Sequence, residues 1–129
     1  MSSQSVVASP STLSHAGKLD PAFATQGKSQ VYFAGSLSSI AHDVAIDSQN
    51  RLLVAAKVGT PGGSRFGLAR LLEDGSADLA FGNQGSVIGQ FQQGFEAMAA
   101  RVRVLPDERI LVVGLHYANT HLTLPALAL

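Results

Sequence analysis

The sequence repeats itself at an interval of 58 residues. The segment 17–27, GKLDPAFATQG, returns as GSADLAFGNQG at 75–85. The register holds without a gap through further matched pairs, among them Phe33 and Phe91, Val44 and Val102, Arg51 and Arg109, and Leu71 and Leu129. A repeat of this length is one supersecondary unit that cannot bury its own apolar face. It therefore predicts a stacked or circular architecture.

Each copy contains short apolar or alternating stretches separated by turn residues, a pattern typical of strands. We predict these strands at 31–33, 41–47, 52–56 and 66–72 in the first copy and at 87–91, 101–105 and 110–113 in the second. Four short strands per repeat match one blade of a propeller. The fold class expected is therefore all-β, with two four-stranded antiparallel units resembling propeller blades. The segment 95–101 is rich in Ala, Met and Glu, so a short helical turn is the alternative there.

The chain divides into three parts. Residues 1–16 are Ser-rich and lack any hydrophobic period, which predicts a flexible N-terminal tail. Residues 17–71 form the first repeat unit and residues 72–129 the second. Pro125 lies in the last stretch of the second unit and cannot donate to a sheet ladder, so the placement of residues 121–129 stays open.

The repeated motif Asp-x-x-Phe-x-x-x-Gly occurs at Asp20, Phe23 and Gly27, and again at Asp78, Phe81 and Gly85. An aspartate at the start of a turn can accept hydrogen bonds from the following backbone N–H groups. The phenylalanine would gain roughly 1.5–3 kcal/mol by burial, and the glycine can adopt a φ that strains other residues. We predict a structural role for the motif. A catalytic or metal-binding role for the two aspartates is the alternative.

Three elements in this order resemble the delta-60 repeat family, a bacterial propeller-like repeat. They are the Gly17–Gly27 turn with its second copy, the hairpins tipped at 48–50 and 106–108, and the strand FGLARL at 66–71. The resemblance covers about residues 17–114. It implies a β-propeller fold without a common enzymatic activity, so it transfers no functional residues. The last strand of the second unit departs from the pattern because it lacks the arginine.

The best candidate ligand-binding residues are a polar and aromatic cluster near the C-terminal end, His116, Tyr117, Asn119 and His121. An aromatic face beside hydrogen-bonding groups suits polar ligands such as sugars. The two histidines lack a third convergent ligand, so no metal site is predicted. Arg101 and Arg103 alternate with valines and should face solvent or an ion-pair partner.

Composition narrows the classes of partner. The chain is 46% hydrophobic and 14% charged, which indicates that part of its surface is buried against another copy. Its net charge is zero and it has no basic cluster, so neither a nucleic acid nor an anionic membrane is expected as a partner. No cofactor fingerprint occurs. The N-terminus does not resemble a signal peptide, which predicts a cytoplasmic protein or one exported without a recognisable signal.

These observations favour a non-enzymatic binding or scaffold module, either lectin-like or protein-binding. The rival is a small hydrolase or isomerase that uses Asp20, Asp78 and a histidine assembled at a subunit boundary. Two blades leave an apolar face and a strand edge uncovered, and propellers typically need about four to eight blades. We therefore expect self-association into a ring, with a homotrimer favoured over a tetramer or dimer. The alternative is that the chain is a fragment of a longer propeller.

Overall fold

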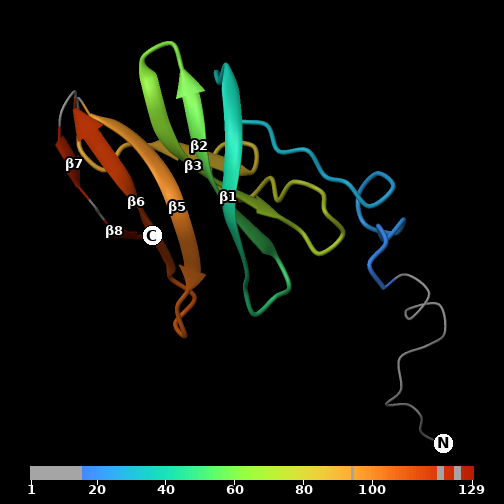
Figure 1. The fold of residues 1–129 in the computed structure, drawn as a ribbon. Helices are drawn as coiled ribbons and strands as arrows, with labels where there is room; N and C mark the ends of the chain where they lie inside the picture. The colour runs from blue at the N-terminus through green and yellow to red at the C-terminus, as the bar shows by residue number, and fades with distance from the viewer. Residues whose placement is uncertain (1–15, 94, 119–120, 124–125) are drawn as a thin grey trace, which may run out of the picture.

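The computed structural model describes residues 16–129 except 94, 119–120 and 124–125. The described part is all-β and contains no helix (Figure 1). Its strands are β1 (Ser38–Ile46), β2 (Leu52–Thr60), β3 (Gly63–Leu71), β4 (Ser86–Gly89), β5 (Glu96–Val104), β6 (Ile110–Ala118), β7 (His121–Thr123) and β8 (Ala126–Ala128).

The strands form two antiparallel sheets. Sheet 1 has the order β1-β2-β3-β4. In sheet 2, β5 pairs with one edge of β6, while β7 and β8 pair with different halves of its other edge. The two short strands thus share one strand position, and sheet 2 is three strands wide in the part of the chain described. The sequence left the placement of residues 121–129 open, and the structure shows that 121–123 and 126–128 lie in sheet 2.

The boundaries of the sheets do not coincide with those of the repeats. β4 belongs to the second repeat in sequence, yet it pairs with β3 and completes sheet 1. The corresponding segment of the first repeat, 31–33, forms no strand, so the prediction of a strand there was wrong. The expectation of two four-stranded units is met in part, because sheet 2 contains four strands but two of them, β7 and β8, share one position. Both differences have one cause, because a fourth strand pairs with the preceding unit rather than with its own.

β5 replaces the helical turn considered for residues 95–101. Ala97 and Ala99 are completely buried in it, at 0% exposure. Their small side chains let β5 pack closely across β1, β2 and β3. This packing outweighs the helix preference of Ala, Met and Glu, as tertiary context commonly does. The register of β5 against β6 shifts between Ala99 and Arg101, and that of β1 against β2 shifts between Ala41 and Asp43. The two irregularities occupy equivalent positions of the repeat.

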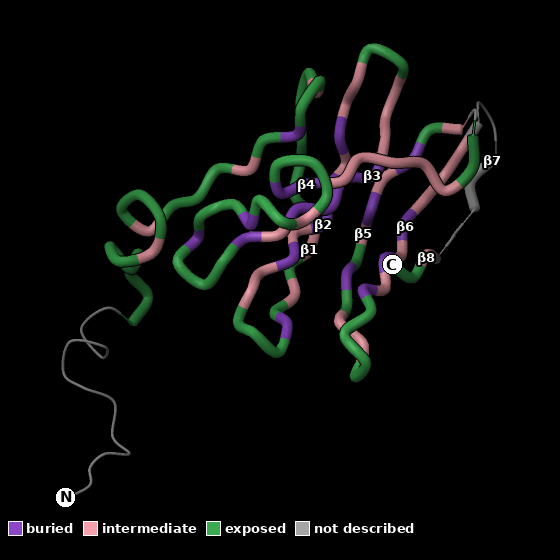
Figure 2. Tube along the Cα trace, turned by 180° about the vertical axis from the view of Figure 1, so that it is seen from behind, coloured by how far each residue is buried: buried purple, intermediate pink, exposed green. Residues whose placement is uncertain are grey.

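The main core lies between the two sheets. Its buried members come from β2, β3, β5 and β6, with Leu53, Leu68, Val102 and Val112 among them. Figure 2 shows these buried segments where the sheets meet, whereas most of the chain before β1 is exposed. A smaller cluster lies on the opposite face of sheet 1, where Phe33 packs against β2 and β3 residues. Sheet 1 therefore has one face covered by a whole sheet and the other covered only by a short segment.

Candidate functional site: two equivalent turns, two sheet faces and a polar pocket

The repeated motif forms the same turn twice. Phe23 N–H donates to Asp20 O at 3.0 Å, and Phe81 N–H donates to Asp78 O at 3.0 Å. The aspartate side chains also accept from the backbone, with Ala22 N–H 2.9 Å from Asp20 Oδ1 and its equivalent 3.2 Å from Asp78 Oδ1. Both carboxylates thus fix the backbone of their own turns.

The glycine that closes each turn has a left-handed conformation, with φ of +82° at Gly27 and +96° at Gly85. A Cβ at Gly27 would lie 2.7 Å from Leu19 Cβ and 3.0 Å from Asp20 O. At Gly85 the nearest atom would be Ala77 Cβ at 3.2 Å. Conformation and space therefore both favour glycine at the end of this turn.

The surroundings of the two aspartates differ. Asp78 is 8% exposed, and its Oδ2 lies 2.7 Å from Arg70 Nε and 3.9 Å from Arg51 NH1. The Arg70 guanidinium also lies over the Phe81 ring, 4.5 Å from its centroid. Asp20 is exposed and has no ion-pair partner among the described residues. The difference arises because the second turn docks on β3, whereas the first turn has no such strand beside it.

The two sheets differ in the same way. Val102 of β5 is 0% exposed because it faces sheet 1, whereas the equivalent Val44 of β1 is 53% exposed. Ile46 is 63% exposed, although its equivalent Val104 packs against the main core. Ile40, 60% exposed, does not belong to this surface, because it is paired with Lys57 and lies on the other face of β1. Sheet 1 therefore presents an uncovered apolar face, which in soluble proteins marks an interaction surface.

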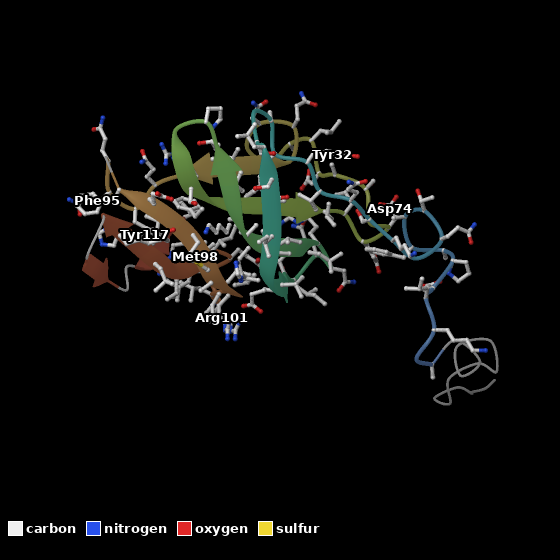
Figure 3. The ribbon with its side chains drawn as sticks, turned by 45° about the horizontal axis from the view of Figure 1, so that its top comes forward. Tyr32, Asp74, Phe95, Met98, Arg101 and Tyr117 are labelled. Atoms are coloured by element: carbon white, nitrogen blue, oxygen red, sulfur yellow. The ribbon has the colours of Figure 1, made fainter. Side chains whose placement is uncertain are left out.

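The carboxylate of Asp43 links the two sheets. Asp43 Oδ2 accepts hydrogen bonds from Val102 N–H at 3.0 Å and from Arg103 NH1 at 2.9 Å. The pKa of the Asp43 carboxyl lies below its ordinary value. The hydrogen bond from Val102 N–H has the largest effect on this pKa, and together with Arg103 it outweighs the opposite effect of burial. Arg103 thus has the ion-pair partner that the sequence left open, while Arg101 is exposed and projects away from the sheets (Figure 3).

A polar pocket lies where the β2–β3 hairpin approaches the start of β5. It measures about 320 Å³ and is lined by Gly62, Arg65, Gln90, Gln93, Phe95 and Glu96. Glu96 Oε2 accepts from Ser64 N–H at 3.1 Å. This hydrogen bond is the main reason that the pKa of Glu96 lies below its ordinary value, and Tyr117 contributes another. No sequence pattern indicated this pocket, because its residues come from the β2–β3 hairpin and from the connection between β4 and the start of β5.

The structure describes only part of the predicted ligand cluster. His116 and Tyr117 are consecutive in β6 and so lie on opposite faces of the sheet. Tyr117 is paired in register with Glu96, and the His116 ring lies 5.3 Å from the Phe95 ring. Figure 3 shows Phe95 and Tyr117 at one end of the molecule. Asn119 lies outside the described residues, as does the side chain of His121, so the cluster stays a prediction.

Within the described ranges, no group of three or more His, Asp or Glu side chains could hold a metal ion. The same part of the chain contains no helix long and apolar enough to cross a membrane. Comparison with protein-family models, curated proteins and solved structures finds no match. The resemblance to the delta-60 repeat family therefore stays a prediction from the motifs.

Proposed function

We propose that this protein is a non-enzymatic scaffold module of the propeller type, whose two sheets assemble with the sheets of further copies. The observation that carries the proposal is the contrast between Val44 and Val102. The same repeat position is 53% exposed in sheet 1 and 0% exposed in sheet 2. A sheet packed onto the open face of sheet 1 would bury Val44 as sheet 1 buries Val102.

The hydrogen bonds of the Asp78 carboxylate support a scaffold function over the hydrolase alternative. One of its oxygens accepts from Ala80 N–H and the other from Arg70. Asp78 is also only 8% exposed, so a substrate has little access to its carboxylate, and a general base must reach the proton it abstracts. The geometry thus favours a structural role for Asp78.

Light scattering on the purified chain, over a range from low to high micromolar concentration, tests the proposal. We expect a homo-oligomer of discrete size, with a trimer favoured because it supplies six blades, within the usual range of about four to eight. Small-angle scattering should then give a compact ring. A well-folded monomer at every concentration contradicts the scaffold proposal.

The polar pocket supports a second candidate function, the binding of a polar small ligand such as a carbohydrate. Phe95 offers an aromatic surface, and Glu96, Gln90 and Gln93 offer hydrogen-bonding groups. A glycan array with the wild-type chain tests this function. Glu96→Gln keeps the shape of the side chain and should weaken binding of any hit, whereas Tyr32→Phe, on the far side of sheet 1 (Figure 3), should leave it unchanged.

A further inference from the structure

One contact inside the chain serves as a template for a contact between chains. β4 pairs with the outer edge of β3, with Leu68 opposite Val87 and Ala69 opposite Ser86. Beyond the paired residues, Arg70 N–H donates to Gly85 O at 2.9 Å, and Asp78 N–H donates to Arg70 O at 3.0 Å. The turn at 78–85 and the strand that follows it, β4, thus both pair with the outer edge of β3.

The chain contains a second copy of the segment that is added and a second copy of the strand that receives it, but these two are not paired with each other. The segment 28–31, which we call the donor segment, is equivalent to β4 and follows the same type of turn, but it is not in a sheet. β8 is equivalent to the end of β3 and pairs with β6 on one side only, so among the described residues its outer edge has no strand. We call this the receiving edge.

The two halves cannot meet within one copy. In Figure 1 the donor segment, in blue, lies on one side of sheet 1, and β8, in red, lies on the other side beyond β5 and β6. The reverse view in Figure 2 shows the same separation. A head-to-tail contact between copies is therefore required to bring them together, and such contacts can close into rings.

We propose that the donor segment of one copy adds as a strand to the receiving edge of the next copy. The 58-residue shift sets the register, with Ser29 opposite Ala126 and Lys28 opposite Leu127. By the same shift, Ala128 N–H donates to Gly27 O, and Asp20 N–H donates to Ala128 O. This inference rests on the proposed scaffold function and identifies its interface.

Charge complementarity agrees with this register. Asp78 is held by Arg70 and, at 3.9 Å, by Arg51. At the equivalent positions Arg70 is replaced by Ala128, but Arg51 is matched by Arg109. The Arg109 side chain is 61% exposed. In the proposed contact it is the cation that faces Asp20 of the copy that supplies the donor segment.

The same arrangement covers the apolar face of sheet 1. Sheet 2 of the copy with the receiving edge would lie on Val44 and Ile46 of the copy that supplies the donor segment, as sheet 1 and sheet 2 lie together within a chain. One element of the internal contact has no equivalent there, since Arg101 stands at the position of Asp43 and Ala45 at that of Arg103. We therefore expect the contact between copies to be weaker than the contact inside the chain, and assembly to depend on concentration.

Proline substitutions test the strand addition. Arg70 N–H faces β4, so by the alternation of an antiparallel ladder Val87 N–H faces β3 and Ile88 N–H faces away. Their equivalents in the donor segment are Ser29 and Gln30. Ser29→Pro removes a donor aimed at the receiving edge and should weaken association at least about tenfold, a loss of roughly 1.4 kcal/mol. Gln30→Pro is the matched control and should associate as the wild type does.

Ser29 Oγ also donates to Gly75 O at 2.6 Å, so Ser29→Ala separates the loss of this bond from the loss of the N–H. It should leave assembly unchanged. Association is measured by sedimentation velocity, and circular dichroism verifies the fold of each variant. Equal effects of the two prolines, or none from Ser29→Pro, overturn the strand addition.

Charge reversal tests the register independently. Asp20→Arg and Arg109→Asp should each weaken association several-fold, and the double variant should recover it because the pair is restored with opposite signs. Failure of the double variant to recover overturns the proposed register. These measurements separate the scaffold function from the interface. A monomeric wild type overturns the scaffold function itself, whereas an oligomeric wild type indifferent to these variants overturns only this interface.

Discussion

Sheet 1 and sheet 2 are built from the same repeat, yet equivalent residues in them have different surroundings. Val102 is 0% exposed and Val44 is 53% exposed. Asp78 is buried beside two arginines, while Asp20 lies in solvent. The β1–β2 and β5–β6 hairpins of the two copies have the same register, down to the irregularity in β1 and β5. Burial at these positions is thus determined by the neighbouring unit and not by the repeat itself.

The largest expected effect comes from placing a charge at the equivalent valines. Val102→Asp buries a carboxylate in the main core and should cost more than about 4 kcal/mol, enough to prevent folding. Val44→Asp should change the unfolding free energy of the monomer by no more than about 0.5 kcal/mol. Urea unfolding at a concentration where the chain is monomeric measures both. Similar losses at the two positions would show that Val44 is already covered within one chain.

The two turn aspartates provide a second, smaller contrast. Asp78→Ala leaves Arg70 without its carboxylate and should destabilise the fold by roughly 1–3 kcal/mol. Asp20→Ala removes only a local hydrogen bond and should cost less than about 1 kcal/mol in the monomer. Thermal melts of the two variants, recorded side by side, give the comparison. A larger loss at Asp20 would contradict the view that only the second turn is docked on a strand.

The carboxylate of Asp43 makes the contact between the sheets dependent on pH. Its pKa is lower in the folded chain than the ordinary 3.8, so its stabilising effect is fully present above pH 3.8 and is lost as the pH falls through the lower folded-state value. Asp43→Asn should cost about 1 kcal/mol at neutral pH. We expect the difference from the wild type to shrink in acid, as followed by urea unfolding from pH 7 downwards. A difference independent of pH would exclude the ionised carboxylate as its source.

The smallest contrast concerns the equivalent arginines. Arg51 is 22% exposed and bonds Asp47, whereas Arg109 is 61% exposed and bonds Asp107. Arg51→Ala should cost about 1 kcal/mol, and Arg109→Ala less than about 0.5 kcal/mol in the monomer because exposed pairs contribute little. Chemical unfolding of dilute samples measures both. A cost at Arg109 as large as that at Arg51 would indicate a partner for Arg109 within the chain.

Much of the architecture could be predicted from the repeat. The period of 58 residues, the two hairpins and the strand around Phe66 all correspond to observed elements, although the strands of the hairpins are longer than predicted. Small residues such as Ala97 and Gly59 weaken the hydrophobic pattern at the strand ends. The donation of β4 to the preceding unit could not be predicted, because pattern shows which segments are extended and not which edge they join.

The candidate sites were less accessible to sequence reasoning. The local hydrogen bonds of Asp20 and Asp78 follow from turn chemistry, but the ion pair of Asp78 with Arg70 depends on how the turn docks on β3. No sequence pattern indicated that Asp43 links the two sheets, because its partners are 59 and 60 residues away in sequence. Adjacent His116 and Tyr117 were grouped by proximity in sequence, yet consecutive strand residues point to opposite faces.

The pairing of β4 with the preceding sheet has a consequence for how such a chain can grow. A gene duplication that adds one whole repeat supplies the outer strand of the sheet before it and three strands of a new one. The number of sheets that have their outer strand rises by one. The last unit still has an outer edge without a paired strand. Conversely, a cut at the sequence boundary between residues 71 and 72 removes an outer strand from the first half. An engineer who wishes to divide this protein should therefore cut after β4, where the sheet ends, and not where the repeat does.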